Sequence, residues 1–127
     1  MSQPGSGIDG DVDLWRRVPA GYWTSGEGSI RVELGAFRNH PETGYMSMQL
    51  AAETDMAAFV RDFDGCAVVV LKASVLVGVG QWIERMPDDG PPGHVGVFGE
   101  KPKSAMKKAV RGGRCIYPSD CGCEPKS

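Results

Sequence analysis

The sequence lacks a hydrophobic run long enough to cross a membrane. Its longest apolar segment, residues 66–80, is interrupted by Lys72 and falls short of the roughly 20 residues that a membrane helix needs. The first residues contain neither the basic region nor the apolar region of a secretory signal. We therefore expect a cytoplasmic protein that has reduced thiols and does not interact with membranes.

Familiar catalytic motifs are also absent. The chain has no G-x-S-x-G nucleophile elbow, no H-E-x-x-H metal motif and no histidine–cysteine pattern of a zinc deaminase. Residues 96–104 place a lysine and a serine after a predicted strand, but they depart from the spacing of a phosphate-binding loop. Pro102 also removes one N–H group that such a loop would use. These absences exclude a P-loop nucleoside triphosphatase and favour a protein that is not an enzyme.

Length and composition are typical of a single globular domain. Of the 127 residues, 41% are hydrophobic and 24% are charged, so the chain can bury a core without disulfides or metals. Glycine and proline are frequent, with 18 and 9 residues, which favours many turns and short elements. We expect a flexible N-terminal tail (1–12), one globular domain (13–118) and a cysteine-containing C-terminal tail (119–127).

Hydrophobic periodicity predicts an α+β fold. Strands are predicted over residues 29–37, 45–50, 66–71, 94–98 and 114–117. The first two of them are expected to pair as an antiparallel hairpin. Apolar residues at helical spacing predict helices over 54–65 and 101–111, whereas residues 74–86 fit either strands or short helices. Together these elements predict a mixed, mainly antiparallel sheet of about five or six strands with two packed helices.

The predicted helix over 101–111 carries an unusual charge pattern. Its apolar positions fall on one arc, and the opposite arc holds Lys101, Lys103, Lys107, Lys108 and Arg111. Residues 101–114 contain six basic and no acidic side chains, whereas residues 1–100 contain seven basic and fourteen acidic ones. The formal net charge of −2 therefore conceals a concentrated positive patch on an acidic body.

The first functional hypothesis is a binding module of a small bacterial or phage protein. In this hypothesis the basic helix docks an acidic partner protein or a nucleic acid. Trp15, Arg17 and Trp23 lie close together in sequence and could stack on a planar group. The alternatives are a solvated lysine face on the helix and aromatic side chains that only cover the core.

The second functional hypothesis is a small enzyme or ligand-binding domain with an anion pocket. His94 opens a predicted strand directly after a glycine- and proline-rich loop, where its side chain could face a cleft and act in catalysis. If the basic helix packs beside this strand, Arg38, His94 and Lys101 could converge on one anion. The alternative is a strand-edge histidine that bonds a backbone carbonyl or water.

A third hypothesis is a zinc-stabilised structural subunit. Cys115, Cys121 and Cys123 follow one another as C-x5-C-x-C and could bind zinc, with His94 or Cys66 as the fourth ligand. The spacing differs from the paired C-x2-C pattern of common zinc sites, so a disulfide, redox-active thiols and simple burial remain alternatives. Residues 74–86 could also supply an edge for a homodimer.

Overall fold

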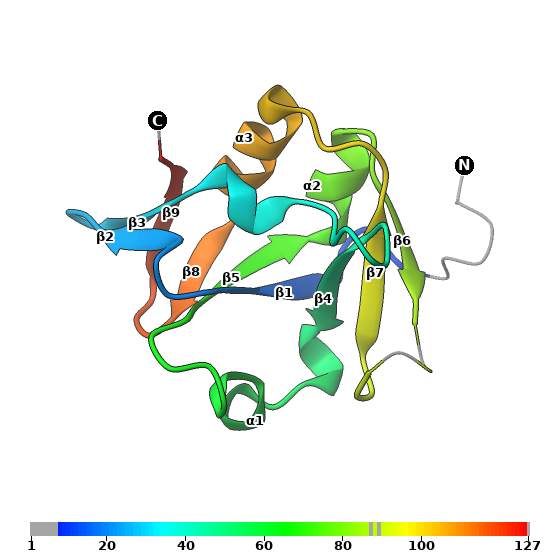
Figure 1. The fold of residues 1–127 in the computed structure, drawn as a ribbon, viewed down its shortest axis with the longest axis horizontal. Coiled ribbons are helices and arrows are strands. Elements are labelled where there is room, and N and C mark those ends of the chain that lie inside the picture. Colours follow the sequence, from blue (N-terminus) through cyan, green and yellow to red (C-terminus); the bar gives the residue numbers. More distant parts are fainter. Residues whose placement is uncertain (1–7, 87, 89, 127) are drawn as a thin grey trace.

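A computed structural model describes residues 8–86, 88 and 90–126 of the chain. It shows an α+β fold with one mixed sheet and three helices (Figure 1). The strands are β1 (Asp13–Val18), β2 (Trp23–Ser25), β3 (Ser29–Val32), β4 (Met46–Leu50), β5 (Ala67–Lys72), β6 (Trp82–Arg85), β7 (His94–Phe98), β8 (Arg114–Tyr117) and β9 (Cys121–Pro125). The helices are α1 (Met56–Val60), α2 (Ala73–Gly78) and α3 (Lys103–Arg111), with short 3-10 helices η1 (Leu34–Phe37) and η2 (Ala51–Glu53).

The sheet has nine strands in the order β2-β3-β9-β8-β5-β1-β4-β7-β6. All neighbouring strands are antiparallel except β3 and β9, which run parallel. The prediction of a mixed, mainly antiparallel sheet is confirmed, but five or six strands was too few. The predicted hairpin was wrong, because β3 pairs with β2 and β9 whereas β4 pairs with β1 and β7.

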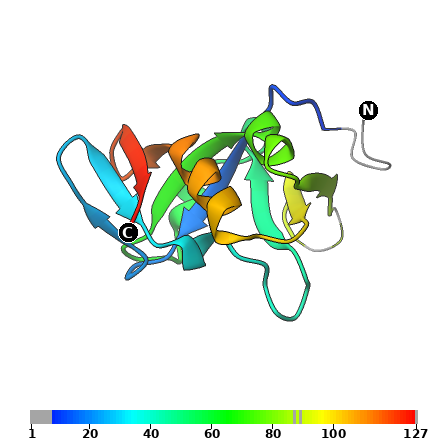
Figure 2. The same ribbon diagram turned by 90° about the horizontal axis from the view of Figure 1, so that it is seen from above.

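The hydrophobic core lies between the sheet and the layer formed by α2, α3 and η1. Figure 1 shows α2 and α3 on one side of the sheet and α1 on the other, and Figure 2 shows α3 lying across the strands. The core includes Leu76 of α2, Met106 and Val110 of α3 and Phe37 of η1. The strand β3 alternates between buried and less buried residues, whereas β5 and β7 are buried along most of their length. The core therefore fixes α3 by its apolar face.

The helix α3 forms close to the predicted place. It begins after Pro102, whose fixed φ suits a helix start, and it ends at Gly112. Its apolar residues Ala105, Met106, Ala109 and Val110 are buried, as the sequence pattern predicts. At nine residues it is the longest of the described helices, and none of them is both long and apolar enough to cross a membrane.

Both predicted tails include residues that contact the domain. Residues 1–7 lie outside the described part of the chain, but Ile8 and Val12 pack against the core. The Val12 carbonyl also accepts a 3.0 Å hydrogen bond from the Ala73 backbone N–H. In the C-terminal segment, β9 inserts between β8 and β3, and Cys123 is buried. The end of the chain therefore completes the sheet.

The buried residue Leu76 and its exposed neighbour Val77 give a test of this packing. Leu76 is fully buried in α2, whereas Val77 is 52% exposed. We expect Leu76→Ala to lower the free energy of unfolding by about 2–5 kcal/mol, because it removes buried methyl groups and leaves a cavity. Val77→Ala, measured in the same urea titration, should change it by less than about 0.5 kcal/mol. Equal losses in the two variants would contradict the position of α2.

Candidate functional site

A cleft opens where strands β1 and β4 stop pairing. The two strands pair only at Leu14–Leu50 and Trp15–Gln49, and beyond these positions they diverge. Two hollows of ≈ 390 Å³ each lie there and share the residues Arg16, Pro19 and Ser47. We call them together the cationic cleft. Each hollow is within the usual size range of a small-molecule site.

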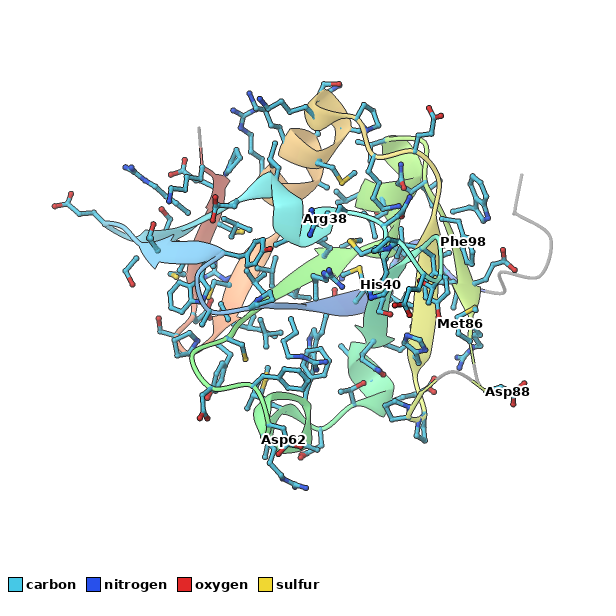
Figure 3. The ribbon with its side chains drawn as sticks, in the orientation of Figure 1. Arg38, His40, Asp62, Met86, Asp88 and Phe98 are labelled. Atoms are coloured by element: carbon cyan, nitrogen blue, oxygen red, sulfur yellow. The ribbon has the colours of Figure 1, made fainter. Side chains whose placement is uncertain are left out.

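The two hollows have different walls. The Arg38 lobe is formed by the η1 region and the loop before β4, and it includes Tyr22, Arg38, His40 and Tyr45. The His94 lobe lies toward α1 and β7, and it includes Arg17, Phe59, Phe63 and His94. Figure 3 labels Arg38 and His40 near the middle of the view, with Arg38 beside η1. The cleft therefore combines aromatic walls with several nitrogen-bearing side chains.

The described side chains that bring a permanent charge to the cationic cleft are all positive. Three arginines and both histidines of the chain line it: Arg16, Arg17, Arg38, His40 and His94. Among the described residues that line it, none is an aspartate or a glutamate. The chain as a whole has a net charge of −2, so this excess of positive charge is local. An arrangement of this kind attracts anions.

Arg16 forms the floor that the two lobes share. Its guanidinium donates two hydrogen bonds to the Ala36 carbonyl, at 2.9 and 2.8 Å, and one to the Ser47 carbonyl at 2.7 Å. These bonds tie β1 to η1 and to β4. Burial, and secondarily repulsion from Arg17, lowers the pKa of Arg16 to about 10. The group therefore stays charged at neutral pH, although only carbonyl oxygens accept these three hydrogen bonds.

Arg17 is held rigidly by aromatic rings. Its guanidinium lies 3.6 Å from the ring centroid of Phe63 and 4.5 Å from that of Phe59. It also donates a 2.9 Å hydrogen bond to the Phe59 carbonyl. Burial lowers its pKa below the usual value. The cation–π contacts and the hydrogen bond fix the position of this charge at the wall of the His94 lobe.

The loop after η1 carries the remaining groups of the Arg38 lobe. Asn39 anchors this loop, because its Nδ2 donates a 3.0 Å hydrogen bond to the Gly99 carbonyl. The side chains of Arg38 and His40 on either side of it are exposed. His40 Nδ1 accepts a 3.1 Å hydrogen bond from the Glu42 backbone N–H, which orients the ring. Arg38 takes part in none of the hydrogen bonds or ion pairs found among the described side chains.

Each lobe contains one buried polar atom without a partner. His94 is 93% buried, since only 7% of it is exposed, and its Nε2 lies 3.0 Å from the Ser47 hydroxyl oxygen. Its Nδ1 has no hydrogen-bond partner, and neither has Asn39 Oδ1. Within the described part of the chain these are the two such atoms. Unsatisfied buried polar atoms are uncommon and frequently mark a functional site.

Lys101 does not line the cationic cleft. Its ammonium group donates to Gln81 Oε1 at 2.7 Å and to the carbonyls of Val97 and Gly99, both at 3.0 Å. Burial, and secondarily repulsion from Arg16, lowers the pKa of Lys101 to about 8. Of the three residues predicted to form an anion pocket, Arg38 lines one lobe of the cationic cleft, His94 lines the other, and Lys101 lines neither.

The tryptophans of the predicted clamp contact the protein itself. The Trp15 ring centroid lies 5.9 Å from that of Phe59, on the side of the sheet that faces α1. Trp23 Nε1 donates a 2.9 Å hydrogen bond to the Gly65 carbonyl, and the ring packs against the core. The structure brings only Arg17 of this clamp into the cationic cleft.

The basic helix residues lie apart from the cationic cleft. Lys103, Lys108 and Arg111 are exposed and Lys107 is partly exposed on the outer face of α3. The ion pairs of the described residues are Lys72–Asp13, Arg85–Glu53 and Arg114–Asp120, so none of them involves α3. This face therefore forms a second cationic surface.

Three of the four cysteines lie on β8 and β9. Cys115 and Cys121 are directly opposite each other in the β8–β9 pair, and Cys123 lies two residues further along β9. Burial, followed by repulsion from the two other thiolates, raises the pKa of Cys123 to about 12. Within the described residues, no group of three or more His, Cys, Asp or Glu side chains could hold a metal ion. The geometry therefore gives the zinc hypothesis no support.

The sequence analysis missed three residues of the cationic cleft. Arg16, His40 and Ser47 were not among the candidate residues. The adjacent arginines followed by Pro19 were the available signal, because a proline ends a strand and opens the space beside it. No sequence pattern indicated that His40 and His94 would line one cleft.

The titration of Lys101 gives a test of its burial. Its pKa is about 8 in the folded protein and near 10.5 in the unfolded chain. Between these values the unfolded chain holds a proton that the folded protein has released, so stability rises with pH. We expect the free energy of unfolding of the wild type to rise relative to that of Lys101→Met across this window. Urea titrations on either side of it measure the difference, and a constant difference would contradict the lowered pKa.

Searches of protein-family models, of curated proteins and of solved structures found no match to the chain. The function of the cleft must therefore be inferred from its own residues: the three arginines, the two histidines and the aromatic walls.

Proposed function

We propose that the protein binds a small anionic molecule in the cationic cleft. This proposal rests on the three arginines and two histidines that line the cleft. No aspartate or glutamate is found among its described lining residues. A ligand with phosphate or carboxylate groups would neutralise charges that the protein leaves unbalanced.

We expect the two lobes of the cationic cleft to bind different parts of the ligand. Arg38 is exposed and is the cation that can move onto a ligand, whereas Arg16 and Arg17 are already fixed by carbonyl groups and rings. Phe63, at 47% exposure, offers an apolar surface beside Arg17. Pre-fixed arginines lose little conformational entropy when an anion binds. We therefore infer an anionic group near Arg38 and an apolar or planar part in the His94 lobe.

The two histidines provide a direct test of this proposal. Because the chain has only these two, and one lies in each lobe, their imidazole NMR signals report on each half of the cationic cleft. Pyrophosphate and citrate serve as probes for phosphate and carboxylate ligands. We expect saturable shifts of the His40 signals. Arg38→Ala should weaken binding by about 10- to 150-fold, since a hydrogen bond to a charged group contributes about 1.5–3 kcal/mol.

The matched control is Arg31→Ala. Arg31 is an exposed arginine on β3, away from the described walls of the cleft, so its removal changes the net charge by the same amount. Unchanged affinity in this variant would assign the effect of Arg38→Ala to the cleft. The proposal fails if neither probe shifts the histidine signals, or if both variants weaken binding equally.

We also propose a second function, in which α3 docks an acidic macromolecule. This proposal rests on the outer face of α3, where Lys103, Lys107, Lys108 and Arg111 take part in none of the described ion pairs. The apolar face is buried in the core, so these cations are presented on a rigid support. Unpaired cations on one helix face attract nucleic acids and acidic protein surfaces.

Charge reversal on α3 tests this second function. The double variant Lys107→Glu/Lys108→Glu should elute from a heparin column at a clearly lower salt concentration than the wild type, because binding to a polyanion depends on the number of contacting cations. Arg31→Glu/Lys126→Glu changes the net charge equally on other elements, and we expect a much smaller shift from it. Equal shifts would show that total charge, and not α3, determines retention.

A further inference from the structure

The β8–β9 pair brings two thiols into register. Cys115 and Cys121 are direct partners across these antiparallel strands. The Cα atoms of directly opposed residues are about 4.5 or about 5.5 Å apart, depending on the type of pair. Both values lie within the usual Cα separation in disulfides, about 4.4–6.8 Å. A bond between these cysteines therefore requires little movement of the backbone.

The third cysteine of this segment is less well placed. Cys123 lies on the same strand as Cys121, two residues along, where the Cα separation is about 6.6 Å and close to the upper limit for a disulfide. Its position relative to Cys115 is diagonal, at about 7–8 Å. The register thus favours Cys121 as the partner of Cys115.

The environments of the two opposed thiols differ. Cys115 is fully buried, and its thiol donates a 3.2 Å hydrogen bond to the Tyr117 carbonyl. Burial raises its pKa, and its interaction with Cys121 adds to the effect. Cys121 is partly exposed and borders a cavity of ≈ 200 Å³ beside Pro118 and Ser119. A small oxidant can therefore reach Cys121 first, with Cys115 directly behind it.

We propose that Cys121 and Cys115 form an intramolecular disulfide when the protein meets a peroxide. The Cys121 thiolate attacks one peroxide oxygen, the O–O bond breaks, and the released hydroxide takes a proton to become water. The Cys115 sulfur then attacks the sulfenic acid at Cys121. The S–O bond breaks as the S–S bond forms, and the hydroxyl leaves with the Cys115 proton as a second water.

This bond would fasten the end of the chain. The strand β9 lies between β8 and β3, and β2 is attached to the sheet through β3. A disulfide between Cys115 and Cys121 would therefore lock β2, β3 and β9 to the rest of the sheet. None of the cysteines lines the described walls of the cationic cleft, so this inference stands apart from the proposed ligand binding.

Peptide mapping of the full-length protein tests the bond. Purified reduced protein is treated with hydrogen peroxide, and the remaining thiols are alkylated after denaturation. Cleavage with trypsin and Asp-N, without reduction, separates Cys115 from Cys121 and Cys123 because Asp120 lies between them. We expect the two peptides to remain joined, with Cys123 alkylated. Cys123→Ser should retain the joined peptides, and Cys121→Ser should lose them.

A second measurement avoids substitutions. Brief alkylation of the native reduced protein should modify Cys121 before the buried Cys115 and Cys123, and this should prevent later joining of the peptides. The inference is overturned if peroxide leaves the wild-type peptides separate. It is equally overturned if Cys121→Ser joins them as well as the wild type does, because Cys123 would then be the partner.

Discussion

The guanidinium of Arg16 holds together the part of the fold on which the cationic cleft depends. Strands β1 and β4 share only two residue pairs before they diverge, and the Arg16 side chain then continues the connection to the Ser47 carbonyl. The same group bonds the Ala36 carbonyl, which fixes η1 over the gap. Hydrogen bonds from a charged donor contribute about 1.5–3 kcal/mol each. Without them, the cleft would have neither its floor nor its upper wall.

The positive charge of Arg16 has no negative partner among its hydrogen-bond acceptors. Carbonyl oxygens satisfy the hydrogen bonds of Arg16 but carry no net charge, so its positive charge remains unbalanced in a partly buried site. Burial is the main cause of the lowered pKa values of Arg16 and Lys101, and repulsion from Arg17 and from Arg16, respectively, adds to it. An anion in the cleft would relieve this repulsion, which is a physical reason for expecting one there.

The sequence predicted those features that depend on local pattern. The position and buried face of α3 followed from its periodicity, Pro102 and Gly112, and the central strand β5 followed from its apolar run. Pairing was not predictable in the same way. The strands β2 and β9 are short and contain Ser, Gly, Cys or Pro, so their alternation is weak, yet β9 inserts beside β3 and displaces the expected hairpin.

The candidate site was predicted only in part, because it too depends on strand pairing. Arg38 and His94 were recognised as candidates from their residue types, and the structure brings both to the cationic cleft. The roles of Arg16 and His40 depend on where the β1–β4 ladder stops, which a single sequence does not specify. Lys101 was expected in the pocket if the basic helix packed beside β7, but its ammonium group donates to the Val97 and Gly99 carbonyls instead.

The carbonyl of Gly99 connects the two cationic surfaces. It accepts hydrogen bonds from Asn39, which anchors the loop of the Arg38 lobe, and from Lys101, which lies just before α3. Gly99 has a φ of 119°, and a Cβ atom there would lie 3.1 Å from the Gln81 side chain, so glycine is required. The loop that carries Arg38 and the start of the basic helix are thus positioned by one backbone group. A ligand that moved the loop would therefore disturb a carbonyl group that also accepts a hydrogen bond from Lys101.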